Sequence, residues 1–266
     1  VKTKGSGWVD YMWPKPGESV VTTKSSYVAS AQYGGKRYIV GSGVYLDGAV
    51  KKELYSGVTA AEVTAFVKEA ALLLEKEGDA AFPEFRRTPG KWFEGERYLF
   101  VYDLDGNRVF HAVEPQTEGK NFIDLKDAYG KPIIKMFIDA TSNESGEGWV
   151  HYLWPKPDTI FPMWKSSFLK RVKFPSGKTY IVGCGIYNMK MEKEFIIGIV
   201  NDAAALIEKE GRGAFGKIRD KSGPFVFLDT YVFVDEPDGT ELVNPAFPSA
   251  ERKNFMGFRD AEGKAL

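Results

Sequence analysis

Two stretches of this sequence combine the residue types that recognise a small anion. Each joins a Tyr-x-Trp-Pro-Lys-Pro word to a later Lys-Ser-Ser-aromatic word. The two sets of candidate residues are Tyr152, Trp154, Lys165 and Ser167, and Tyr11, Trp13, Lys24 and Ser26. An ammonium group offers a carboxylate charge-assisted hydrogen bonds, hydroxyl groups orient it, and aromatic rings exclude water. The words therefore suit a pocket for a small carboxylate. In the structural alternative the rings fill the core, the lysine reaches solvent and the serines cap a strand.

Four further residues complete the two predicted sets. His111 and Asn244 stand at matching places in two similar segments, where a polar side chain suits either a ligand or the closing of a strand end. Phe100 and Phe233 hold matching places in the strands just before them. We therefore predict ligand contacts from His111 and Phe100 in one set, and from Asn244 and Phe233 in the other.

No catalytic or metal-binding pattern stands out. The sequence has no nucleophile elbow, phosphate loop, dinucleotide fingerprint or zinc-protease word. Two histidines and one cysteine are too few for a histidine cluster or a cysteine-rich metal site. Cys184 lies between glycines in a predicted strand, which favours a small buried residue over a nucleophile. His151 alternates with the inward candidates of its strand and is predicted to lie at the surface. We expect no enzyme activity, no metal and no cofactor.

The charge balance excludes two classes of partner. Lys and Arg total 36, and Asp and Glu also total 36. A chain without net charge has no overall attraction for nucleic acid or for an anionic membrane. The sequence also lacks a run of about 18 apolar residues, so we expect no membrane insertion by this chain.

Repeated segments divide the chain into units. Gly7 to Pro16 returns as Gly148 to Pro157, and Lys36 to Tyr45 returns as Lys178 to Tyr187. A second group of matches, from Glu75-Lys-Glu-Gly78 to Lys120-Asn-Phe122, returns near the C-terminus at a different offset. Such a long-period repeat indicates duplicated structural units. Residues 48–189 would hold one complete unit, whereas residues 1–47 and 190–266 would be complementary halves of a second.

Three arrangements of the two terminal halves remain open. They could pair within one molecule, pair between neighbouring molecules to give swapped dimers or fibres, or belong to a longer array. We favour closure within the molecule, because neither half alone buries its apolar face. The predicted helix Lys131–Ala140 has no full counterpart at the termini, so it is dispensable there, removed, or supplied by something else.

Periodicity predicts the same elements in each unit. Apolar residues recur at helical spacing over Glu62–Glu77 and Phe195–Glu210, and a glycine follows each stretch. A hairpin with an Asp-Gly turn is predicted over residues 97–113, and its counterpart over residues 231–243. Three further alternating stretches are Trp8–Trp13, Lys165–Val172 and Tyr180–Tyr187. An antiparallel sheet of about five strands with a long helix belongs to the α+β class.

These words resemble the extracytoplasmic sensor modules called Cache domains, in particular the single-Cache type 2 form. The resemblance covers essentially the whole chain. It rests on three stretches that follow one another in order: Gly119 to Gly130, Gly148 to Phe168, and Tyr180 to Tyr187. It implies PAS-like modules that bind small organic acids or similar metabolites, and a periplasmic or extracellular location. The usual form has flanking membrane helices and a cytoplasmic output domain, and we expect neither within these 266 residues.

Two functions of different classes follow. The first is a sensor protein that binds short carboxylates, with Lys165 or Lys24 as counter-charge, in signal transduction or chemotaxis. The alternative is a structural subunit in which terminal halves complete neighbouring copies and so cause self-association.

Overall fold

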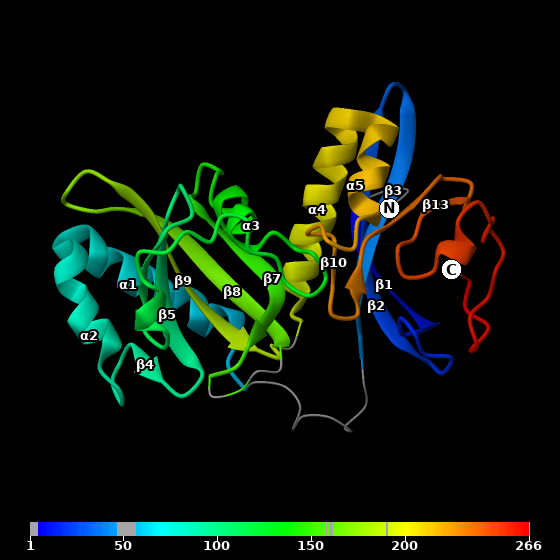
Figure 1. Cartoon of the computed structure of the whole chain (residues 1–266). Coiled ribbons are helices and arrows are strands. Elements are labelled where there is room, and N and C mark those ends of the chain that lie inside the picture. Colours follow the sequence, from blue (N-terminus) through cyan, green and yellow to red (C-terminus); the bar gives the residue numbers. More distant parts are fainter. Residues whose placement is uncertain (1–4, 47–56, 158, 160–161, 190, 266) are drawn as a thin grey trace. The chain divides into compact units, whose positions relative to one another are not determined.

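The computed structural model describes residues 5–46, 57–157, 159, 162–189 and 191–265 (Figure 1). Its contacts divide the chain into two compact units. The central unit is Glu53–Lys190, and the terminal unit combines Val1–Lys52 with Met191–Leu266. The boundary predicted between residues 47 and 48 lies outside the described residues, and residue 190, at the second boundary, does so as well.

The central unit is built on an antiparallel sheet. The strand order is β4-β5-β9-β8-β7, and β6 pairs with β5 on the edge opposite β9, farther along the same edge as β4. Alternating side chains place every second residue of a strand on the same face of this sheet. The strands are β4 (Phe93–Glu94), β5 (Arg97–Asp103), β6 (Arg108–His111), β7 (Glu147–Pro155), β8 (Pro162–Lys173) and β9 (Thr179–Tyr187).

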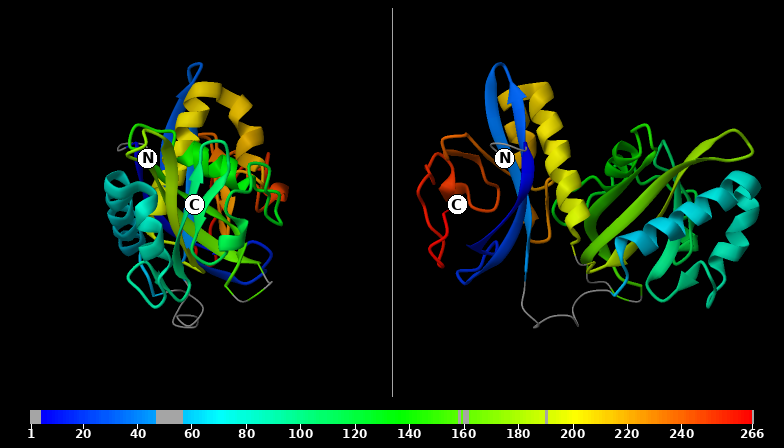
Figure 2. Two further views of the ribbon diagram at one scale, coloured as in Figure 1. Left: turned by 60° about the vertical axis from the view of Figure 1, so that its left-hand side comes forward. Right: turned by 180° about the vertical axis from the view of Figure 1, so that it is seen from behind.

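Helices cover both faces of the central sheet. The long helix α1 (Ala60–Glu77) begins at Thr59, whose side chain forms a capping box with Glu62, and it packs against β8 and β9 (Figure 2). The helix α3 (Ile133–Ala140) contacts β7 and covers the other face. Shorter elements are α2 (Phe82–Arg86) and the 3-10 turns η2 (Gly78–Ala81) and η3 (Pro115–Thr117).

The terminal unit has a sheet of the same strand pattern, assembled from both ends of the chain (Figure 1). Strand β3 (Lys36–Tyr45) pairs with β12 (Phe233–Asp235), with Gly41 opposite Phe233. The sheet order is β1-β2-β3-β12-β13, and the pairing between N-terminal and C-terminal segments occurs within one chain. The other strands are β1 (Ser6–Pro14), β2 (Val21–Tyr33), β10 (Val226–Phe227), β11 (Thr230–Tyr231) and β13 (Glu241–Val243).

The helices of the terminal unit lie on one face of its sheet. The long helix α4 (Lys193–Glu210) packs against β2 and β3, and α5 (Ala214–Arg219) follows it (Figure 2). The remaining 3-10 turns are η4 (Gly211–Gly213) and η5 (Pro248–Ala250). Within its described residues, this unit has no helix corresponding to α3.

A matching hydrogen bond fixes one edge strand of each sheet, β7 in the central unit and β1 in the terminal unit. The Asp127 carboxylate accepts from the backbone N–H of Leu153 in β7, and the Asp260 carboxylate accepts from that of Met12 in β1, both at 2.9 Å. Each aspartate therefore ties the loop after the hairpin to the strand that carries the Tyr-x-Trp word.

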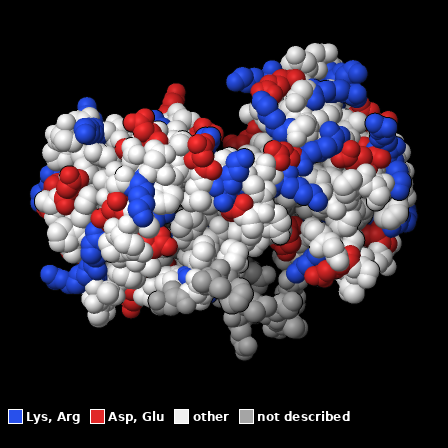
Figure 3. Space-filling model, in the orientation of Figure 1, with Lys and Arg blue, Asp and Glu red and all other residues white. Residues whose placement is uncertain are grey.

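The α+β class predicted from periodicity is confirmed, and antiparallel sheets with long helices form both units. No helix in the described ranges is long and apolar enough to cross a membrane. On the face shown in Figure 3, acidic and basic side chains are interspersed over both units.

Candidate ligand-binding site

One face of the central sheet gathers the predicted residues. Tyr152 on β7 is the cross-strand partner of Lys165 on β8, and Lys165 is in turn opposite Tyr187 on β9. Cross-strand partners point to the same face, so alternation also brings Trp154 and Ser167 to that side. Phe168 has the opposite parity and contacts Trp149 on the other face, where the two ring centroids are 5.4 Å apart.

Two glycines on β9 leave room for this cluster. A Cβ atom at Gly183 would lie 2.5 Å from the Phe100 ring. A Cβ atom at Gly185 would collide with Ser167 and would lie 2.5 Å from Cε of Lys165. The Gly-Cys-Gly word therefore lets the lysine side chain lie flat across its neighbouring strand.

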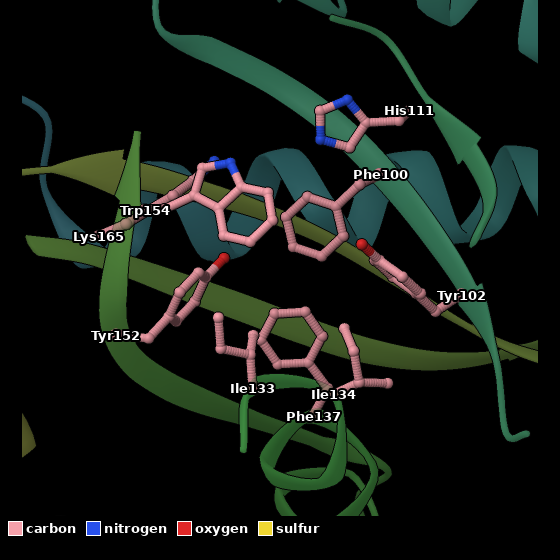
Figure 4. Close-up of a pocket in the computed structure, with 9 residues that line it drawn as sticks. All are labelled: Phe100, Tyr102, His111, Ile133, Ile134, Phe137, Tyr152, Trp154 and Lys165. Atoms are coloured by element: carbon pink, nitrogen blue, oxygen red, sulfur yellow. The ribbon is translucent and has the colours of Figure 1, made fainter. Parts of the chain in front are cut away.

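A small cavity lies between this face and α3 (Figure 4). Its volume is about 240 Å³ including the part open to solvent, and the space left between the side chains fits little more than one water molecule. Apolar side chains make most of its wall, and polar atoms enter from four strands, β5, β6, β7 and β8. The lining residues are Phe100, Tyr102, His111, Ile133, Ile134, Phe137, Tyr152, Trp154 and Lys165.

Lys165 is the cationic residue among those that line the cavity. Its side chain is 1% exposed, and Nζ donates to the Tyr98 hydroxyl at 2.6 Å. The Tyr98 hydroxyl lies 3.3 Å from that of Tyr187, which donates to the carbonyl of Pro155 at 2.6 Å. Within the described part of the chain, no carboxylate forms an ion pair with Lys165. Burial lowers the pKa of its ammonium group to about 7.

A buried arginine holds the far side of the cavity. Arg108 is 1% exposed, and its Nε donates to the Tyr102 hydroxyl at 2.7 Å. A second nitrogen donates to Glu114 Oε2 and to Thr117 Oγ1, each at 2.6 Å. Since the Tyr102 oxygen accepts from Arg108, its own hydroxyl hydrogen is free to donate into the cavity. Burial raises the pKa of Tyr102 to about 12, so this donor is neutral.

His111 presents a neutral ring to the cavity. Its Nδ1 accepts from the backbone N–H of Glu114 at 2.9 Å, so in the neutral ring the hydrogen lies on Nε2. Burial, together with the charges of Arg108 and Lys165, lowers the pKa of this imidazole to about 2. His111 therefore acts as a hydrogen-bond donor and does not change charge near neutral pH.

Ser167 supports the wall from behind. Its hydroxyl lies 2.9 Å from that of Tyr152, and both side chains are buried. Of the central candidates, Ser167 is the one outside the lining, and it orients Tyr152 instead. Tyr152, Trp154, Lys165, His111 and Phe100 all lie at the cavity.

The predicted residues of the terminal unit also share one sheet face. Tyr11 is the cross-strand partner of Lys24 and lies 3.0 Å from Ser26 through the two hydroxyl groups. The Tyr11 and Trp13 rings are 6.1 Å apart. Lys24 Nζ lies 5.7 Å from the centroid of the Phe233 ring.

Asn244 lies at the end of the same face. Its Oδ1 accepts from the backbone N–H of Phe247 at 2.9 Å, as His111 Nδ1 does from Glu114. Its Nδ2 donates to Glu241 at 2.5 Å. All the terminal candidates therefore lie around one lysine, although their surroundings differ from those of the central cavity.

Sequence reasoning missed several residues that shape the central cavity. Tyr98 lies two positions before Phe100 on the same strand, so strand alternation could have found it. Arg108, Tyr102 and the α3 residues gave no comparable signal, since their place depends on the hairpin register and the helix packing.

One sequence expectation was wrong and another was confirmed. His151, expected at the surface, is 8% exposed, because α1 covers its face of the sheet, and its Nδ1 lies 2.8 Å from Ser166 Oγ. Cys184 is buried as predicted, and burial raises the pKa of its thiol to about 11. The described ranges contain no group of three or more His, Cys, Asp or Glu residues arranged to hold a metal ion.

Comparisons with known proteins place this geometry in a family context. The Cache domain family model matches residues 71–215, which is more than half of the chain. The methyl-accepting chemotaxis protein McpP of Pseudomonas putida is 27% identical over 139 residues, covering 52% of this chain and 25% of that protein. The sensor histidine kinase MctS of Rhizobium johnstonii is 37% identical over 90 residues, covering 34% of this chain and 18% of that protein.

Solved structures are similar to a part of the chain. A structure described as the periplasmic sensor domain of a chemotaxis protein is 30% identical, with 48% of this chain and 93% of that chain covered and a TM-score of 0.41. The present chain spans a quarter or less of the length of the two curated relatives. These two relatives are a chemoreceptor and a sensor kinase. The length of the family match shows that this chain belongs to the Cache domain family.

Proposed function

We propose that this chain is a sensor module whose central unit binds a small carboxylate in the cavity beside Lys165. One observation carries the proposal, namely a fully buried ammonium group whose hydrogen-bond partner is a neutral tyrosine hydroxyl. Burying a cation without a counter-ion costs free energy, and the interactions within the fold do not explain why this cost is tolerated. An anionic ligand would supply the missing counter-charge.

The other donors around the cavity suit a carboxylate group. Tyr102, Tyr152 and His111 Nε2 bring neutral hydrogen-bond donors to the same space as Lys165. No acidic side chain is among the lining residues, and the Glu114 carboxylate, 4.0 Å from His111 Nε2, is paired with Arg108. The aromatic and aliphatic wall would bury a short hydrocarbon tail and strengthen the ion pair by excluding water.

The size of the cavity limits the ligand. Side chains nearly fill the cavity in this structure. A ligand must therefore be small, and side chains such as those of α3 must move slightly to admit it. Short monocarboxylates such as acetate and propionate meet this condition better than longer ones. We therefore place the specificity of the site among short organic acids.

We further infer that the terminal unit is a second Cache-like module. The order β1-β2-β3-β12-β13 in the terminal sheet matches the order β7-β8-β9-β5-β6 in the central sheet, and Lys24 and Lys165 have equivalent cross-strand partners. Both observations support this interpretation. Because the relatives are much longer, the output of the whole protein, such as chemotaxis or kinase control, also belongs to the proposal. The same holds for a periplasmic or extracellular location.

Titration calorimetry of the whole chain tests the central site. Acetate, propionate and butyrate serve as probes for the wild type, Lys165→Met and the matched control Lys24→Met. We expect Lys165→Met to weaken propionate binding at least ~100-fold, because it removes the charged partner of a buried ion pair. Lys24→Met should leave the propionate affinity of the central unit unchanged.

A melting curve separates loss of the site from loss of the fold. Methionine keeps the apolar stem of lysine and removes the buried charge, so Lys165→Met should melt at or above the wild-type temperature. The proposal fails if no short carboxylate binds the folded wild type, or if propionate binds Lys165→Met as tightly.

A further inference from the structure

The terminal unit carries two acidic residues where the central unit has a tyrosine and an arginine. Asp235 and Glu241 are cross-strand partners on β12 and β13. Tyr102 and Arg108 are cross-strand partners at the equivalent place on β5 and β6. The same corner of the sheet face is therefore cationic in the central unit and acidic in the terminal unit.

These two carboxyl groups have no cationic partner among the residues that the structure describes. Glu241 is 5% exposed and accepts a hydrogen bond from Asn244 Nδ2 at 2.5 Å. Asp235 is half-buried, and its burial, with the nearby Glu241, raises its pKa to about 8. Two close, poorly solvated carboxyl groups favour the approach of a positive charge.

Lys24 supplies an independent sign of a missing ligand. It is 1% exposed, and its Nζ has no hydrogen-bond partner in the described part of the chain. The ammonium group lies over the Tyr231 ring, 3.9 Å from the centroid, and 5.7 Å from that of Phe233. Asp229 and Glu241 both attract the Lys24 ammonium group electrostatically, yet Nζ forms no hydrogen bond with either carboxyl group. A buried ammonium group without a hydrogen-bond acceptor indicates an absent anion.

We propose that the terminal unit binds a small amino acid, with its carboxylate on Lys24 and its ammonium group on Asp235 and Glu241. A simple anion would satisfy Lys24 but would face the acidic pair, and a simple amine would leave Lys24 unpaired. A zwitterion satisfies both. The half-buried rings of Tyr11 and Trp13 lie on the same sheet face as Lys24, and the faces of such rings attract an ammonium group.

The central cavity would reject the same ligand. Arg108 occupies the place of Glu241, so an ammonium group there would meet a buried guanidinium. The inference rests on the proposed function in one respect, because it treats the terminal unit as a second binding module. The ligand class of each unit is separately measurable.

Propionate and L-alanine form a matched pair of probes, since they share a carbon skeleton and differ by the ammonium group. β-Alanine tests a longer spacing between the two charges. We expect calorimetry of the whole chain to show binding of at least one of the two amino acids. That binding should persist in Lys165→Met, which removes the central anchor. It should weaken at least ~10-fold in the double variant Asp235→Asn with Glu241→Gln.

Circular dichroism of the double variant reports whether the terminal unit remains folded, and its propionate binding reports on the central unit. If the double variant unfolds, Glu241→Gln alone is expected to give the same direction of change. The proposal is overturned if neither amino acid binds the wild type, or if binding is unaffected by removal of the acidic groups. Amino-acid binding without propionate binding would contradict the proposed function of the central unit and leave this inference standing.

Discussion

Two buried lysines at equivalent register positions have different surroundings in the two units. Lys165 donates to the Tyr98 hydroxyl at 2.6 Å, whereas Lys24 lies over the Tyr231 ring and has no hydrogen-bond partner among the described residues. The equivalent strand position places a lysine on one face of the sheet in each unit. The neighbouring hairpin decides which other charges that cation meets, and so which ligand each face suits.

The covering of the two faces also differs. In the central unit α3 brings Ile133, Ile134 and Phe137 over the sheet, and Tyr152 is 3% exposed. In the terminal unit Tyr11 is half-buried, since its described residues contain no helix equivalent to α3. The difference shows that a shared strand pattern does not by itself close a binding cavity.

The largest change in the free energy of unfolding should come from replacing Arg108, which lies where the terminal unit has Glu241. We expect Arg108→Met to lower the free energy of unfolding by about 3 kcal/mol, because Tyr102, Glu114 and Thr117 lose a buried charged donor. The equivalent change Glu241→Gln should cost under about 1 kcal/mol, since it removes a carboxyl group that burial makes unfavourable. Guanidinium unfolding followed by circular dichroism measures both. Equal losses of unfolding free energy in the two variants would show that Arg108 and Glu241 are equally well paired with their neighbours, which would contradict this comparison.

The pH dependence of binding should separate the two sites next. Because burial sets the pKa of Lys165 near 7, the free protein loses this proton above pH 7, and binding of an anion must restore it. Propionate affinity should therefore fall about tenfold between pH 8 and pH 9. Below pH 7 the affinity should level off, since Lys165 is already charged and His111 stays neutral.

Calorimetry at pH 8 in buffers of different ionisation heat counts the protons taken up. Propionate should take up close to one proton. The amino acid should take up fewer, because Lys24 gains a proton while Asp235, with a raised pKa of about 8, loses one. Propionate affinity that stays constant from pH 7 to pH 9 would rule out a charged Lys165 as the anchor.

The smallest expected effect concerns the tyrosine of the repeated word. Tyr152→Phe should lower the free energy of unfolding by about 1 kcal/mol, because the buried Ser167 hydroxyl loses its partner at 2.9 Å. Tyr11→Phe should cost roughly 0.5 kcal/mol, since Tyr11 is half-buried and water replaces part of the lost bond. Thermal unfolding measures both losses. A larger loss in Tyr11→Phe would contradict the view that α3 makes the central face the drier one.

Much of the candidate site could be predicted from repeated words. Tyr152, Trp154 and Lys165 stand out because the same residue types return at the same spacing, and strand alternation places them on one face. His111 emerged from its match to Asn244. The role of Ser167 could not be predicted, because a hydroxyl on the correct face contacts either the ligand or a neighbouring side chain, and only the packing of Tyr152 decides between them.

The sequence alone determined the α+β class, the long helices and the strands that carry the two lysines, because these follow from local periodicity and from repeated words. Only the tertiary structure decided which side chains surround each lysine. Tyr98, Arg108 and α3 reach Lys165 through cross-strand pairing and helix packing between segments that are distant in sequence. The contrast between Arg108 and Glu241 was visible in the sequence, but its meaning depended on knowing that each faces a buried ammonium group.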